Sequence, residues 1–135
     1  MAKAQRITYF KITLEDKPGA LLEIAKDLKA KNAGLVGLKA LESQPGQTAA
    51  YLIPKNPDKL RGTLKSLGVT FEEGTSFFVK GADKTGALIK SLEAIAGAGV
   101  NIIETDAIAA GGNYGAFFRV ASGDAEKTAK ALGAK

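Results

Sequence analysis

The sequence predicts an α+β protein built from two tandem copies of one βαββαβ unit, and two observations lead to this prediction. First, residues 16–21 (DKPGAL) reappear as residues 83–88 (DKTGAL), so the same loop occurs twice at a shift of 67 residues. The same shift pairs further residues along the chain: Phe10 with Phe77, Ala40 with Ala107, and Ala49 with Ala116. Second, apolar residues alternate before each loop, as in strands, and recur at helical spacing after it. We therefore expect a first domain over residues 1–73 and a second over residues 74–135.

The first copy begins with a strand and a helix, which two further strands follow. Residues 7–14 alternate polar and apolar side chains, which predicts a half-buried strand, and residues 21–28 carry the apolar stripe of an amphipathic helix. Two further strands are expected at about residues 35–41 and 49–53, on either side of a turn over residues 43–46 (SQPG).

The first copy ends with a second helix and a last strand. Leu60, Leu64 and Leu67 predict the helix, Gly68 ends it, and residues 69–73 predict the strand. The second copy repeats the order as far as its second helix, with strands at 77–80, 100–110 and 114–120, a turn at 111–113, and helices near 88–95 and 124–132. Together these elements predict antiparallel sheets with helices on one face.

The second copy lacks its own last strand. Gly133 corresponds to Gly68, but only two residues follow it, which are too few for a strand. A missing strand leaves an unpaired sheet edge, and proteins usually cover or pair such edges. We expect the other copy or a second subunit to complete this edge; a short disordered tail is the alternative.

The composition excludes several classes of function. The chain contains no Cys, His or Trp, so a Ser-His-Asp triad, a thiol nucleophile, a disulfide and a zinc finger are excluded, and we expect no catalytic residue, metal or cofactor. No apolar run reaches the roughly 20 residues of a membrane span, and the start lacks a signal peptide. We expect a cytoplasmic protein without membrane contact.

The net charge of +5 raises the question of nucleic-acid binding. In residues 23–31, however, lysines alternate with acidic residues, which is typical of the solvated face of a helix. We therefore do not expect nucleic acid as a partner.

The repeated loop lies between a strand and the start of a helix, where backbone N–H groups lack partners and carry partial positive charge. Gly19 and Gly86 allow close approach to the backbone, so a carboxylate could bind these N–H groups while Asp16 or Asp83 receives an ammonium group. A free α-amino acid carries both charges. The alternative interpretation is that each Asp only caps its helix.

The loop with the sequence DKPGAL, followed by a helix and a strand that opens GVNI at residues 99–102, resembles the ACT domain. This resemblance covers nearly the whole chain as two tandem copies. It implies a ferredoxin-like βαββαβ regulatory module that binds amino acids or other small ligands between the strand–helix loop of one module and the second strand of a neighbouring one. The residues that it implies as ligand-binding are Asp16, Pro18, Gly19, Ala20, Leu21, Asp83, Thr85, Gly86, Ala87, Leu88, Asn101 and Ile102.

This resemblance favours a non-catalytic sensor of a small molecule, most readily a free amino acid, that acts as a homodimer. The alternatives are a ligand-free dimerisation module and an RNA-binding ferredoxin-like protein, whose sheet would stack bases on aromatic side chains. No arrangement of carboxylates and lysines suggests an enzyme.

Two smaller patterns complete the predictions. Glu104 and Asp106 lie two residues apart in an expected strand and therefore face the same way, with Arg119 on the neighbouring strand as a possible partner. The pairs 77–78 and 117–118 (both FF) each place one ring on either sheet face, so one ring of each pair should belong to the core.

Overall fold

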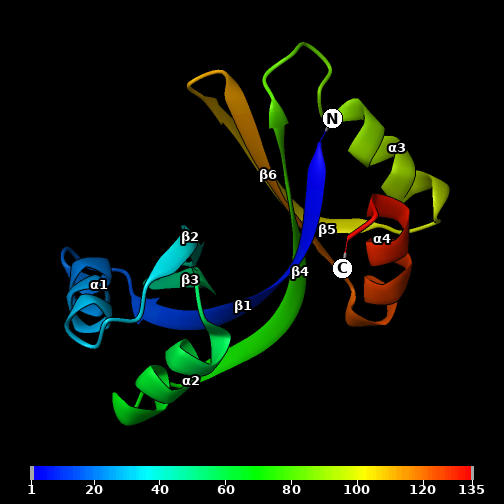
Figure 1. Cartoon of the computed structure of the whole chain (residues 1–135). Helices are drawn as coiled ribbons and strands as arrows, with labels where there is room; N and C mark the ends of the chain where they lie inside the picture. Colours follow the sequence, from blue (N-terminus) through cyan, green and yellow to red (C-terminus); the bar gives the residue numbers. More distant parts are fainter. Residues whose placement is uncertain (1, 135) are drawn as a thin grey trace. The chain divides into compact units, whose positions relative to one another are not determined.

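The computed structural model describes residues 2–134 as an α+β protein (Figure 1). The elements follow in chain order: β1 (Lys3–Glu15), α1 (Ala20–Ala30), β2 (Leu35–Gln44), β3 (Gln47–Pro54), α2 (Pro57–Ser66), β4 (Phe71–Ala82), α3 (Ile89–Gly97), β5 (Ile102–Ala110), β6 (Asn113–Val120), a 3₁₀ turn (Ser122–Asp124) and α4 (Ala125–Leu132). This order confirms the predicted tandem βαββαβ fold with a second copy that lacks its last strand. None of the described helices has the length and apolar character that crossing a membrane requires.

The chain divides into two compact units. The first module is Thr8–Gly74, and the second module combines Met1–Ile7 with Thr75–Lys135. The sequence-based division assigned residues 1–73 to one domain and 74–135 to the other; these units differ from it chiefly in the placement of residues 1–7. β1 is one strand whose first part belongs to the second module and whose remainder belongs to the first.

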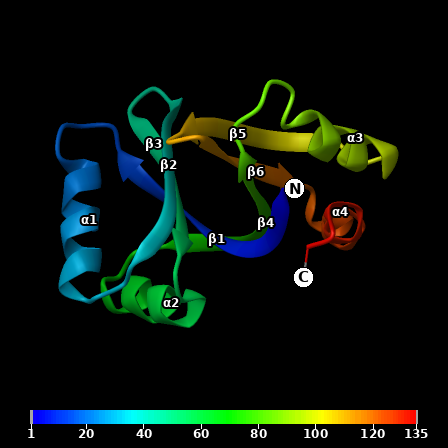
Figure 2. The same ribbon diagram turned by 45° about the horizontal axis from the view of Figure 1, so that its top comes forward.

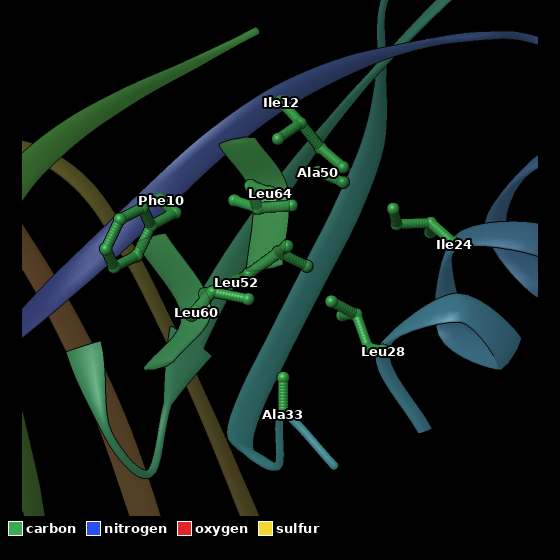
Figure 3. Packing of buried hydrophobic residues seen from close by; sticks show 9 residues of the cluster. All are labelled: Phe10, Ile12, Ile24, Leu28, Ala33, Ala50, Leu52, Leu60 and Leu64. Carbon is green, nitrogen blue, oxygen red and sulfur yellow. The ribbon is translucent and has the colours of Figure 1, made fainter. Parts of the chain in front are cut away.

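The first module packs two helices on one face of a sheet with the strand order β2-β3-β1-β4. Figure 2 gives a second view of α1 and α2 beside these strands. Figure 3 shows Ile24 and Leu28 of α1 pointing toward the strands that carry Ile12 and Leu52. The buried cluster contains residues from both helices, two strands and the connection between α1 and β2: Phe10, Ile12, Ile24, Leu28, Ala33, Ala50, Leu52, Leu60 and Leu64. These residues include the apolar stripes from which both helices were predicted.

Two polar contacts fix α2 of the first module. The Asn56 side chain accepts a hydrogen bond from the Lys59 amide at 3.2 Å and so caps the helix. On the helix surface, Arg61 donates to the two carboxylate oxygens of Glu73 at 2.7 and 2.8 Å. These hydrogen bonds lower the pKa of the Glu73 carboxyl, so the charged pair ties α2 to β4.

The second module has the strand order β1-β4-β6-β5, with β5 at its edge. Phe77 and Phe118 face each other across β4 and β6 and are completely buried, which confirms that one ring of each aromatic pair belongs to the core. On the opposite face, Arg119 donates to Glu104 at 2.9 Å, as the alternation of the two strands suggested. The remaining core residues come from β4, β6, the two helices and the segment between α3 and β5: Val79, Ile95, Val100, Tyr114, Ala116, Val120 and Ala129.

Residues Lys3–Ile7 of β1 complete the strand set of the second module. Ala4 packs against the buried cluster of that module, and the Arg6 guanidinium donates to both carboxylate oxygens of Glu126 on α4 at 2.9 and 3.1 Å. Of the two sources expected for the missing strand, the structure therefore uses the first copy of the repeat.

The structure corrects one residue pairing in the repeat. Phe10 is paired with Leu52, and the equivalent Phe77 is paired with Phe118. Leu52 and Phe118 are therefore equivalent, so residues of β3 and β6 correspond at a shift of 66. Ala116 therefore corresponds to Ala50 and not, as a uniform shift of 67 implied, to Ala49. The cause is a register irregularity in β2 between Glu42 and Gln44, which adds one residue to the first hairpin.

We predict that Ala4→Glu destabilises the second module by about 1–3 kcal/mol, because the substitution places an unpaired carboxylate against an apolar core. Gln5→Glu is the matched control, since Gln5 is exposed and adjacent on the same strand. Hydrogen exchange of the β4 amides 77–79 is the measurement. Equal protection in the two variants would contradict the assignment of residues 3–7 to this core.

Candidate ligand-binding site

The second module carries an open groove of about 310 Å³ beside the repeated loop. One wall is the loop and the first turn of α3, and the other is the last part of β5. The lining residues are Asp83, Lys84, Gly86, Ala87, Leu88, Ile89, Leu92, Ala107, Ile108, Ala109 and Tyr114. Four of the residues expected from the sequence therefore line one surface: Asp83, Gly86, Ala87 and Leu88.

Backbone hydrogen bonds give the loop its shape. The Asp83 amide donates to the Gly112 carbonyl at 2.9 Å, and the Ala87 amide donates to the Lys84 carbonyl at 2.9 Å. Gly86 has φ +78°, a left-handed conformation that glycine adopts at little cost. Among residues 2–134, the amides of Gly86 and Leu88 have no hydrogen-bond acceptor. These donors are available to an anion at the start of α3.

The aspartates do not cap their helices, so the capping interpretation is wrong. The N-cap positions are Gly19 for α1 and Leu88 for α3, and neither helix has a side-chain cap. Asp83 precedes α3 by six residues, and its carboxylate has no partner among residues 2–134. Its position at the groove leaves the carboxylate available to a cation or an ammonium group.

The rest of the groove is mostly apolar. Ile89 and Leu92 on α3 are both exposed, and Ala107 and Ala109 on β5 have side chains no larger than a methyl group. The buried Tyr114 ring also lines the groove, and its hydroxyl is 3.5 Å from the Ala87 carbonyl to which it donates. This surface is suited to an apolar group attached to a polar head.

Three other expected residues of the second copy are not among those that line the groove. Thr85 belongs to the loop but not to the lining set. Asn101 precedes β5 and Ile102 begins it, whereas the loop lies beside residues 107–109. Seven residues of extended strand separate Ile102 from Ala109, or roughly 23 Å at the usual rise. The structure therefore does not bring Asn101 and Ile102 to the loop of their own module.

In the first module, the expected residues form the corresponding loop before α1. Asp16, Pro18 and Gly19 precede the helix, and Ala20 and Leu21 are its first residues. The backbone repeats that of the second copy, since the Asp16 amide donates to the Gly46 carbonyl at 3.0 Å and Gly19 has φ +87°.

The side chains around this loop differ from those in the second module. The Thr48 hydroxyl lies 3.4 Å from the Asp16 carboxylate, to which it donates. The Glu42 carboxyl also hydrogen-bonds with Asp16, which raises the pKa of Glu42 because the protonated form donates to the neighbouring carboxylate. The Asp16 carboxylate therefore accepts a hydrogen bond from Thr48, whereas the Asp83 carboxylate has no partner among residues 2–134. Among residues 2–134, no three acidic side chains gather as a metal ion would require.

Sequence reasoning missed the residues outside the loop that shape this site. Tyr114, Ala107 and Ala109 line the groove in the second module, and Glu42 contacts the loop in the first. The sequence held one signal. When the two copies are aligned at a shift of 67, Glu42 and Ala109 occupy the same position of the repeat. The sequence does not show where this position lies in the fold. The strand pairing shows that it lies beside the repeated loop.

Several solved structures are similar to this chain over nearly its whole length. Protein BT0572 from Bacteroides thetaiotaomicron has a TM-score of 0.84 at 24% identity, over 96% of this chain and 88% of that one. The ligand-free regulatory subunit of aspartate kinase from Thermus thermophilus has a TM-score of 0.64 at 15% identity, over 98% and 94%. A putative C-terminal regulatory domain of aspartate kinase from Porphyromonas gingivalis has a TM-score of 0.60 at 13% identity, over 98% and 93%.

The fold is therefore the tandem ACT-type fold that the resemblance in the repeated loop implied. No protein-family model matches the sequence. No curated protein matches it either. At these identities, the structural likeness establishes the fold.

We predict that Gly86→Ala destabilises the protein by about 1–2 kcal/mol, because alanine in the left-handed region is strained. Its methyl group would also lie 3.2 Å from Ile89 Cδ1. Gly97→Ala is the matched control, since Gly97 lies in α3 without a close neighbour. Alanine there should be neutral or stabilising. Denaturant unfolding measures both, and equal stabilities would contradict the strained loop geometry.

Proposed function

We propose that the chain is a non-catalytic regulatory protein that binds a free amino acid in the groove of the second module. The observation that supports this proposal is that three features line the same groove. They are the Asp83 carboxylate and the amides of Gly86 and Leu88, which have no partner among residues 2–134, and an apolar wall. The regulatory domains that share the fold support a regulatory role.

The chemistry of the groove defines the class of ligand. The α-carboxylate would accept hydrogen bonds from the amides of Gly86 and Leu88, and the α-ammonium group would pair with Asp83. The side chain would lie against Ile89, Leu92 and Tyr114, where a charged group would lose hydration without gaining a partner. We therefore propose an amino acid with an apolar side chain.

The RNA-binding alternative loses support from the burial of the aromatic residues. Base stacking on a sheet requires accessible rings. Phe77 and Phe118 are completely buried in the core, and Phe117 is also buried. The cytoplasmic location remains a prediction.

We predict that apolar L-amino acids raise the unfolding temperature and that Asp83→Asn weakens their binding tenfold or more. The variant removes the charge that pairs with the ammonium group, a hydrogen bond worth about 1.5–3 kcal/mol. A ligand at 100 times its Kd adds about 2.7 kcal/mol of stability, which shifts the unfolding temperature by several degrees. A thermal-shift panel of the free amino acids, followed by calorimetry, measures both effects.

The matched control for this experiment is Asp27→Asn. Asp27 is exposed on α1 in the first module and does not line the groove, so its loss of charge should leave binding unchanged. A panel in which no amino acid stabilises the wild-type protein would refute the proposed function and favour a ligand-free dimerisation module.

We also propose that the chain forms a homodimer through an edge strand. β5 is the edge strand of its module and carries two exposed apolar side chains, Ile103 and Ile108, the latter 78% exposed. Unpaired edges with exposed apolar residues favour pairing with another chain. This assembly would bring residues of a second copy to the side of β5 where the groove lies.

We predict that Ile108→Lys converts a wild-type dimer into a monomer, since a lysine on an edge strand opposes pairing. Light scattering coupled to size exclusion gives the mass, and the exposed Lys90→Ala on α3 serves as a control. A monomeric wild-type protein, or a variant that remains dimeric, would contradict this use of β5.

A further inference from the structure

We propose that the second module holds a further ligand site, separate from the amino-acid groove, that takes a small monocarboxylate with an apolar chain. The site is a groove of about 380 Å³ between the start of β1 and α4. Its lining residues are Arg6, Glu126, Lys127, Ala129, Lys130 and Ala134. None of these residues lines the groove beside the repeated loop.

The chain leaves α2 of the first module and α4 of the second in the same way. After α2, the Val69 amide donates to the Leu64 carbonyl at 3.0 Å. After α4, the Ala134 amide donates to the Ala129 carbonyl at 2.8 Å. The residue before each donor is a glycine with a left-handed φ, of +73° after α2 and +70° after α4. Residues of the two helices therefore correspond at a shift of 65.

An ion pair relates each of these helices to a strand. In the first module, Arg61 on α2 pairs with Glu73 on β4. In the second module the charges are exchanged, since Glu126 on α4 pairs with Arg6 on β1. Arg61 and Glu126 are equivalent positions of the two helices. Glu73 and Arg6 therefore occupy equivalent positions on the strands that face them.

Four apolar positions hold a larger residue in the first module and alanine in the second. Three of them lie on the helix or just after it, and the fourth lies two residues before the ion-paired residue of the strand, on the same face. The larger residues are Leu60, Leu64, Val69 and Phe71, and their counterparts in the same order are Ala125, Ala129, Ala134 and Ala4. Less side-chain volume therefore lies between α4 and β1 than between α2 and β4, and the groove lies at this place.

Basic side chains exceed acidic ones in the lining of this groove. Arg6 donates to both carboxylate oxygens of Glu126, so these two charges balance each other. The Lys127 Nζ atom lies 3.4 Å from a carboxylate oxygen of Asp124. Lys130 has no acidic partner among residues 2–134. The excess of positive charge favours a ligand with an anionic head group.

The charge and the apolar surface together define the class of ligand. The groove has the volume of a small-molecule site, for which about 300–1,000 Å³ is usual. An apolar chain would lie against Ala129 and Ala134, and a carboxylate at the end of this chain would pair with Lys130. A free amino acid fits less well, because Glu126, the acidic residue of the lining, is already paired with Arg6.

The test is a titration of the full chain with sodium octanoate, followed by the ¹H–¹⁵N resonances of two glycines. Gly133 adjoins Ala134 and should shift, whereas Gly86 in the amino-acid groove should not. Each methylene removed from the probe, as in heptanoate and hexanoate, should weaken binding by up to about fourfold. Octylamine has the same chain with a cationic head group, so it should bind at least tenfold more weakly.

Variants of the lining test its shape and its charge separately. Ala129→Leu and Ala134→Val each introduce the residue of the first module, so each should fill the groove and weaken octanoate binding at least tenfold. Lys130→Ala removes one surface charge and should weaken binding about two- to fivefold. The matched control is Lys90→Ala, which changes an exposed lysine of α3 outside this groove and should leave binding unchanged. Thermal unfolding verifies that each variant is folded, and Ala134 is the less buried of the two alanines.

Several results would overturn this site. They are the absence of octanoate binding, a shift of Gly86 in place of Gly133, equal affinity for octanoate and octylamine, and unaltered binding in both alanine variants. The amino-acid groove is tested independently, by the panel of free amino acids and the Asp83→Asn variant.

Discussion

The continuous strand β1 is the constraint on which the rest of this structure depends. Within residues 2–134, the second copy contributes three strands of its own, in β4, β5 and β6. Residues Lys3–Ile7 supply the fourth, and the contacts of Ala4 and Arg6 hold it against the core and α4. Because the remainder of β1 belongs to the first module, neither copy of the repeat is complete without this strand. The position of β5 at the sheet edge, and so the open side of the groove, follows from this strand set.

The groove depends on two features: backbone amides provide hydrogen-bond donors, and the size of the neighbouring side chains determines its shape. A left-handed glycine turns the chain before α3, and the amides of Gly86 and Leu88 at the helix start have no acceptor in the described part of the chain. The small residues Ala107 and Ala109 on the neighbouring strand leave space in front of these amides. The binding surface therefore requires a fixed backbone and the absence of large side chains at two positions.

The sequence was sufficient to predict the fold because its signals were local and repeated. Alternation, helical stripes and the duplicated loop each follow from residues close together in the chain, and all of them indicated two βαββαβ copies. The site was predicted only in part. Asp83, Gly86, Ala87 and Leu88 lie in the repeated loop and were found, whereas Tyr114 and Ala109 reach the groove through strand pairing. The register irregularity near Glu42 is not evident from the sequence, so the sequence did not predict that β3 and β6 correspond at a shift of 66 residues.

The divergence of the two loops bears on how such a chain could transmit a signal. A duplicated module with two equal sites would respond to ligand through two binding equilibria, whereas a chain with one site responds through a single one. A ligand shifts a conformational equilibrium only by its difference in affinity for the two states. The groove lies in the second module, so a ligand bound there would act through the loop before α3 and the last part of β5.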